Sequence, residues 1–174
     1  RVVNMGSMFH NATSANPDTS LWDTGQVTSM DGMFGFFVID YETDSWSPIE
    51  NVANPQTGAW NTSRVTDMSA MFVGTQRAVP NTRNWDTSAV ISMAALFNTT
   101  VLANPDTSRW NTSRVQDFRV MFADTEQANP DTSGWNTAQV TDMSGMFAGA
   151  AQATPDMSNW QFGAIMGDSD QIDF

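Results

Sequence analysis

Hydrophobic residues recur along most of the chain at the same positions of a 25-residue unit. In the unit that begins at Trp60, a valine follows at Val65, a methionine at Met68, and a Met-Phe pair ends at Phe72. The tryptophans of successive units stand at Trp60, Trp85, Trp110, Trp135 and Trp160. Similarity at a fixed period is typical of repeat architectures, in which each unit buries its apolar residues against its neighbours. We therefore expect residues 1–174 to form one repeat domain.

The repeat unit predicts a stack of short coils. It is shorter than the roughly 33 residues of a two-helix repeat and suits a leucine-rich-repeat coil. The segment from Ser108 to Thr112 alternates as a short strand would, which predicts a strand that pairs in parallel with its copies. The segment from Ser69 to Phe72 predicts one helical or 3₁₀ turn. The predicted fold class is an α/β repeat, a leucine-rich-repeat-like solenoid of about 25-residue coils with a short parallel strand plus a helical or 3₁₀ turn per coil.

The same alternation predicts which side chains point into the stack. Trp110 and Thr112 share one side of the predicted strand, so both are expected to face inward. The tryptophans should then form a buried, stacked row, and the threonine hydroxyls should satisfy backbone groups. The alternative is an outward threonine row of the kind found on ice-binding solenoids.

The unit boundaries divide the chain into repeats that start near residues 22, 60, 85, 110, 135 and 160. The unit between Trp22 and Trp60 spans 38 residues, so it carries an insertion loop at about residues 35–50. Tyr41 and Trp46 of this loop are candidate ligand-binding residues, although packing of the loop onto the stack is the favoured alternative. The first repeat lacks its tryptophan, and the register ends after Ile165. We expect the chain to be a fragment of a longer protein.

Composition excludes several function classes. The formal net charge is −12, and all seven basic residues are arginine, so the chain should repel nucleic acids and anionic membranes. No apolar run approaches the roughly 18 residues of a membrane span. Cysteine is absent, and His10 is the single histidine, which leaves no material for disulfides, thiol catalysis or histidine clusters. The sequence predicts no enzyme.

The repeat resembles a known family. The segments Trp60 to Phe72 and Trp135 to Phe147 are similar to the BspA-like leucine-rich repeats of bacterial surface proteins. The resemblance implies a tandem-repeat module, secreted or on the cell surface, that takes part in adhesion and has no catalytic residues. This chain departs from the family pattern at Ala-Asn-Pro-Asp-Thr-Ser, where relatives more often carry an apolar residue. That corner of the coil therefore calls for another stabiliser.

Calcium is the candidate stabiliser of this corner. Oxygen-bearing side chains stand at alternate positions of the turn, as in the opening of many calcium-binding loops. The candidate metal ligands are Asn16, Asp18, Asn104, Asp106, Ser108, Asn129, Asp131 and Asp156. Stacking would bring the carboxylates of successive coils close together, where a cation would offset their repulsion. The alternative is that the aspartates only cap their turns and keep the protein soluble. The sequence leaves both interpretations open.

The expected function is non-enzymatic adhesion, or ligand or protein binding, in an extracellular or cell-surface protein. Repeat proteins recognise partners through positions that vary while the scaffold stays fixed. Two such positions hold Arg64, Arg109 and Arg114, which are rare positive charges on an acidic chain and candidate ligand-binding residues. The expected partner is a host-cell or surface protein, or a glycan, with no role for nucleic acid or membrane insertion. The alternative function is a passive structural spacer.

Overall fold

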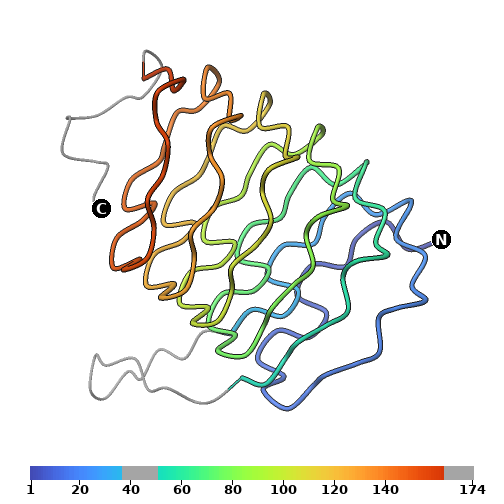
Figure 1. Cartoon of the computed structure of the whole chain (residues 1–174). Helices are drawn as coiled ribbons and strands as arrows, with labels where there is room; N and C mark the ends of the chain where they lie inside the picture. The colour runs from blue at the N-terminus through green and yellow to red at the C-terminus, as the bar shows by residue number, and fades with distance from the viewer. Residues whose placement is uncertain (37–50, 163–174) are drawn as a thin grey trace.

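The computed structural model describes residues 1–36 and 51–162, and the predicted ligand-binding residues Tyr41 and Trp46 lie outside them. In the described part, the chain winds into successive coils that stack side by side (Figure 1). The first described coil and the last one lie at opposite ends of the stack. Main-chain hydrogen bonds join residues that are about one repeat apart, such as the N–H of Thr141 and the carbonyl of Gln116 at 2.8 Å.

One side of the stack, the bridge face, is held by backbone pairing. The N–H of Thr66 donates to the carbonyl of Thr28 on the preceding coil at 2.8 Å, and the N–H of Met68 donates to Ser92 on the following coil at 3.1 Å. The parallel bridges fall at one position per coil. This bridge row consists of Asn4, Ser29, Asp67, Ser92, Asp117 and Asp142. Within the described residues, no strand extends beyond these single bridges, and no helix forms.

The predicted helical turn at Ser69 to Phe72 is wrong. Ala70 has a φ of 53°, a left-handed value that breaks any right-handed helical turn. Its N–H donates to the carbonyl of Ala94 on the next coil at 2.8 Å, while the N–H of Val73 donates back to Ala70 at 3.2 Å. Along this segment, every second N–H therefore bonds to the next coil, and the N–H groups between them close tight turns within the coil. In a helix, all of these N–H groups would bond within the segment.

The predicted strand from Ser108 to Thr112 is also wrong, because this side of the coil is built from tight turns. The N–H of Trp110 donates to the carbonyl of Thr107, and the N–H of Val115 donates to Thr112, both at 3.0 Å. Coils are joined here by a side chain. The Thr112 hydroxyl donates to the carbonyl of Asn136 at 3.0 Å and accepts from the N–H of Asn136 at 2.8 Å. The chain is therefore not an α/β repeat with a strand and a helical turn per coil.

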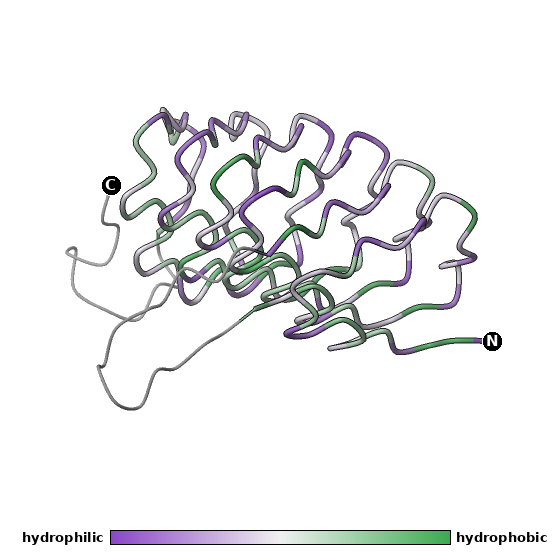
Figure 2. Ribbon diagram, turned by 90° about the horizontal axis from the view of Figure 1, so that it is seen from below, coloured by the Kyte–Doolittle hydropathy of each residue, from purple (hydrophilic) through white to green (hydrophobic). Residues whose placement is uncertain are grey.

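The predicted burial of the tryptophans and of Thr112 is confirmed. Trp110 is 4% exposed and Thr112 is 1% exposed. The ring centres of Trp110 and Trp135 lie 6.3 Å apart with nearly parallel planes, and Trp85 stacks on Trp110 in the same way at 6.1 Å. The Met-Phe positions form a second stack, in which Phe72 and Phe97 lie 5.8 Å apart. Hydrophobic and hydrophilic stretches recur at similar places in successive coils (Figure 2).

Candidate binding face

The candidate site is the side of the stack that carries the tryptophan turns, here called the Trp face. On each coil it runs from one buried threonine, such as Thr107, past the tryptophan and a second threonine, to a buried valine such as Val115. The residues between these buried positions point outward, as Arg109, Asn111 and Arg114 do. Each coil therefore offers a small set of exposed side chains on a frame that repeats.

The buried threonines explain how this face stays ordered without a sheet. The first threonine of the coil donates its hydroxyl to a carbonyl of the next coil, as Thr82 does to Asp106 at 2.8 Å and Thr107 does to Asp131 at 2.7 Å. The second threonine does the same, as Thr87 does to Asn111 at 3.0 Å. Burying a hydroxyl costs little free energy when the hydroxyl is hydrogen-bonded, and these hydrogen bonds join each coil to its neighbour.

The predicted ligand-binding arginines lie on the Trp face. Arg64, Arg109 and Arg114 are all exposed, and the guanidinium of Arg64 donates to the amide oxygen of Gln26 at 3.1 Å. The position of Arg109 is taken in other coils by Leu21, Ala59, Asn84, Gly134 and Asn159. The position of Arg64 and Arg114 is taken by Gln26, Ala89 and Gln139. Side chains of every size fit here, so the fold does not require arginine.

The predicted calcium ligands lie on the edge of the same face, where the structure gives their side chains definite hydrogen bonds. One carboxylate oxygen of Asp106 accepts from the N–H of Ser108 at 3.2 Å and from its hydroxyl at 2.6 Å. The amide oxygen of Asn104 accepts from the N–H of Asn129 on the next coil at 3.0 Å. Asp18, Asp131 and Asp156 cap their turns in the same way, with the N–H two residues later at 2.9 to 3.1 Å. Asn16 and Asn129 likewise accept from the next coil.

These hydrogen bonds also favour the ionised carboxylate. The hydroxyl and the N–H of Ser108 hold the pKa of Asp106 below its usual value, with a smaller contribution from the charges of Arg83 and Arg109. The serines two residues later lower the pKa of Asp18 and Asp156 in the same way. The aspartates therefore serve as charged turn caps at neutral pH.

The aspartate turns supply some of the oxygen ligands that a cation needs. Asp131 and Asp156 border one hollow of about 250 Å³ together with Asn129 and Thr154. Only one oxygen of each carboxylate caps its turn, and the other accepts no hydrogen bond from the described residues. The structure brings together no group of three or more His, Asp or Glu side chains suited to a metal within residues 1–36 and 51–162. Calcium stabilisation stays a prediction.

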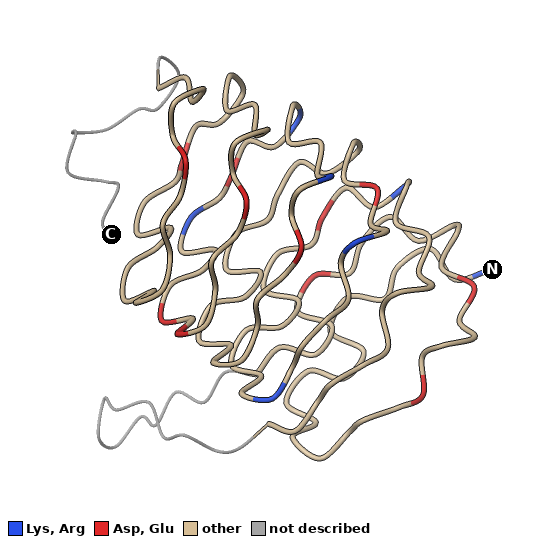
Figure 3. Ribbon diagram, in the orientation of Figure 1, with Lys and Arg blue, Asp and Glu red and all other residues tan. Residues whose placement is uncertain are grey.

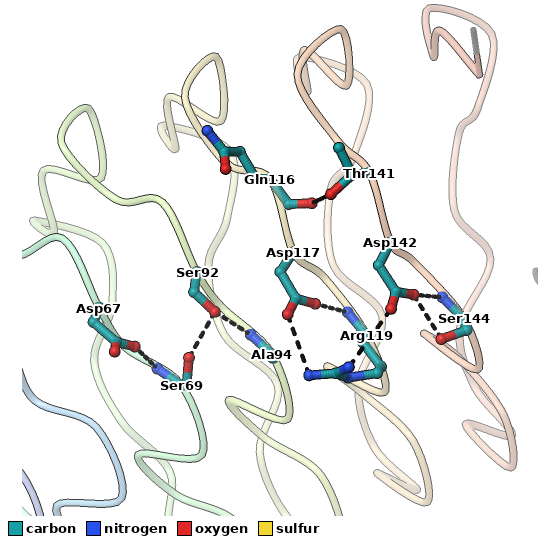
Figure 4. A network of polar contacts seen from close by, with 10 residues as sticks. All are labelled: Asp67, Ser69, Ser92, Ala94, Gln116, Asp117, Arg119, Thr141, Asp142 and Ser144. Carbon is teal, nitrogen blue, oxygen red and sulfur yellow. Dashed lines mark hydrogen bonds and ion pairs between the residues drawn. The ribbon is translucent and has the colours of Figure 1, made fainter. Parts of the chain in front are cut away.

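The bridge face carries a second row of polar contacts, drawn in Figure 4. Arg119 donates to Asp117 of its own coil at 3.4 Å and lies 3.6 Å from a carboxylate oxygen of Asp142 on the next coil. The hydroxyls of Ser69 and Ser92 are 2.6 Å apart. Sequence reasoning did not identify Arg119 as the cation between two aspartates of this row. The position of Arg119 two residues after Asp117 was the available signal.

Charged residues are spread unevenly over the stack (Figure 3). Sequence reasoning missed Arg83, which is exposed beside the first threonine of its coil. It also missed a hollow of about 400 Å³ one coil earlier, which Gly58 and Ala59 help to line. Both features lie on the Trp face.

A comparison with family models matches residues 1–54 and 42–160 to the family described as "Mycoplasma protein of unknown function, DUF285". The chain belongs to this family. No curated protein and no solved structure matches the chain. The family description assigns no activity. Among the described residues there is no helix of the length and apolarity that crossing a membrane requires.

Proposed function

We propose that the Trp face is a non-enzymatic binding surface that serves adhesion or the capture of a protein or glycan partner. The observation that carries the proposal is the contrast between buried and exposed positions of this face. Thr107, Trp110 and Thr112 have buried counterparts of the same type in neighbouring coils. The exposed position of Arg109 holds a different residue type in almost every coil. A fixed frame with variable outward positions is how repeat proteins create binding surfaces.

The adhesive role of the BspA-like surface proteins, which the repeat resembles, belongs to this proposal. So does an extracellular or cell-surface location, with a host-cell or surface molecule as the partner. The stack of coils in Figure 1 supports such a role, because the exposed positions of the Trp face recur from coil to coil.

The test is a screen of immobilised proteins and glycans against the chain and against two variants. The first variant exchanges residues of the Trp face for those of neighbouring coils, as Asn84→Gly and Arg64→Gln. The second makes the same kind of exchange on the bridge face, as Arg119→Ser, because Ser69 and Ser144 occupy the equivalent positions. We expect at least one ligand whose binding is lost in the first variant and retained in the second.

A passive spacer would give a different result. The folded chain would then bind none of the immobilised molecules, and both variants would behave like the parent chain. That result would contradict the proposed binding function.

A further inference from the structure

The inference rests on the proposed binding function and names the class of its ligand. We propose that the Trp face binds an anionic polysaccharide, carboxylated or sulfated, across the coils that begin at Trp60, Trp85 and Trp110. Four exposed arginines lie on this part of the face. They are Arg64, Arg83, Arg109 and Arg114, more than half of the basic residues of the chain.

The fold does not account for these arginines. The position of Arg83 is held by Ser20, Gly58, Ser108, Ser133 and Ser158 in other coils. Within residues 1–36 and 51–162, the guanidinium groups of Arg83, Arg109 and Arg114 make no hydrogen bond or ion pair. By contrast, the guanidinium of Arg119 on the bridge face is placed between two carboxylates. Arg83, Arg109 and Arg114 therefore keep their donors free for a ligand, while Arg64 shares its guanidinium with Gln26.

Fewer acidic residues lie on the part of the Trp face that carries the arginines. Asp18, Asp106, Asp131 and Asp156 occupy one position of the turn, but the two coils between Asp18 and Asp106 carry neutral residues there. These neutral residues are Gln56 and Asn81. Between Arg64 and Arg114, the Trp face carries only Asp86 and Asp106 against four guanidinium groups, because Asp67 lies on the bridge face. The local charge is thus positive on a chain whose net charge is −12.

The surface beside the arginines is hollowed, and amide side chains form part of the lining. The hollow of about 400 Å³ is bordered by Ser20, Asn54, Gln56 and Asn81, and Gly58 forms part of its wall. On the next coil, the side-chain amide of Asn84 donates to the carbonyl of Gly58 at 3.3 Å, and Arg83 stands beside it. Amides donate to and accept from hydroxyl groups, and guanidinium groups bind carboxylate and sulfate by paired hydrogen bonds.

This combination favours an anionic polysaccharide over other polyanions. A charged sugar polymer presents hydroxyls and anions at short intervals, so it matches amides and guanidiniums arrayed along successive coils. An acidic peptide lacks the hydroxyls. A nucleic acid carries a dense phosphate charge that the acidic remainder of this chain would repel. The tryptophans are buried, so sugar rings would be held by polar contacts rather than by stacking on indole rings.

The test measures binding of the whole chain by calorimetry at low ionic strength. The probes are polygalacturonate, dextran sulfate, unmodified dextran, polyglutamate and duplex DNA. We expect binding to one or both charged polysaccharides, none to dextran, and affinities at least about tenfold weaker for polyglutamate and DNA. The charged polysaccharide that binds more tightly identifies carboxylate or sulfate as the preferred anion.

Variants drawn from the chain's own repeats locate the site. The double change Arg83→Ser and Arg109→Asn installs residues that neighbouring coils carry at these positions, and it should weaken binding at least about tenfold. Arg119→Ser removes one positive charge from the bridge face and should change the affinity less than about twofold. Gly134→Arg adds a guanidinium to the next coil, where an added Cβ meets no atom within 4 Å, and it should tighten binding.

Three results would overturn the inference. They are no binding to either charged polysaccharide, equal binding to polyglutamate or DNA, and an equal loss in the Arg119→Ser control. If the screen finds an uncharged ligand that depends on the Trp face while the charged polysaccharides fail, the proposed function stands and this inference falls.

Discussion

The two faces of the stack join successive coils through different kinds of hydrogen bond. On the bridge face, the N–H of Thr66 reaches the carbonyl of Thr28, so the backbone itself joins the coils. On the Trp face, the backbone bonds close tight turns, and the hydroxyl of Thr112 makes the link to Asn136. A backbone link tolerates many side chains, whereas the hydroxyl link requires a threonine in each coil that bonds in this way to the following one. The sequence of the Trp face is therefore the more constrained of the two, and it can vary only at the outward-facing positions.

The largest difference should appear when a large side chain is removed from each face. Trp110→Ala should lower the free energy of unfolding by about 3–5 kcal/mol, because it opens a cavity between the rings of Trp85 and Trp135. Its indole N–H has no partner in the described chain, so the loss comes from packing. Ile91→Ala on the bridge face, where Ile91 is 36% exposed, should cost less than about 1 kcal/mol. Chemical denaturation of both variants checks this contrast, and equal losses would contradict it.

Calcium should stabilise the Trp face through its aspartate turns. An ion held between coils adds about 2.7 kcal/mol at a hundredfold excess over its Kd, so millimolar calcium should raise the melting temperature by several degrees. Asp131→Asn keeps an oxygen for the turn cap but removes the charge, so it should lose part of this rise. Asp124→Asn, a carboxylate outside these turns, should keep the full rise. Identical melting curves in calcium and in EDTA would leave the aspartates as turn caps alone.

Low pH should lower the stability of the Trp face, with a smaller effect than the loss of Trp110 or of calcium. The serine hydrogen bonds depress the folded-state pKa of Asp18, Asp106 and Asp156, so their contribution is present above the unfolded pKa, near 3.8. It is lost as the pH falls through the lower folded-state pKa. Asp106→Asn should reduce this acid sensitivity, because Asn81 caps the equivalent turn with an amide oxygen at 3.3 Å from the N–H of Arg83. Thermal melts between neutral pH and pH about 3 measure the effect, and an unchanged acid dependence would argue against the caps.

The sequence predicted which side chains are buried better than it predicted the backbone conformation. The period and the alternation at Trp110 and Thr112 placed both side chains inside, where the structure has them. The two-residue spacing of Trp110 and Thr112 covers only the junction of two turns, and within each turn the buried residues stand three positions apart, as Thr112 and Val115 do. The deciding feature is the threonine hydroxyl that replaces a backbone partner, and it depends on the neighbouring coil. A pattern within one coil does not contain that information.

The left-handed backbone that breaks the predicted helical turn did leave a trace in the sequence. Ala70, Ala95 and Val120 adopt it, and alanine or valine alone gives no hint of it. The equivalent positions of two other coils are Gly32 and Gly145, which take the same conformation at no steric cost. A comparison of all coils at this position would have argued against a helix. For the candidate site, the variable positions of Arg64, Arg109 and Arg114 were accessible from the repeat, but the hollow beside Gly58 required the structure.

The comparison of Thr112→Val with Thr66→Val tests the central claim most directly. Both changes replace a hydroxyl by a methyl on a β-branched side chain. Thr112→Val removes the partner of both the N–H and the carbonyl of Asn136, so chemical denaturation should show a loss of about 1–3 kcal/mol. The hydroxyl of Thr66 only adds to a carbonyl that its own N–H already reaches, so Thr66→Val should stay within about 0.5 kcal/mol of the parent chain. Equal losses in the two variants, or none in Thr112→Val, would contradict a Trp face held together by threonine.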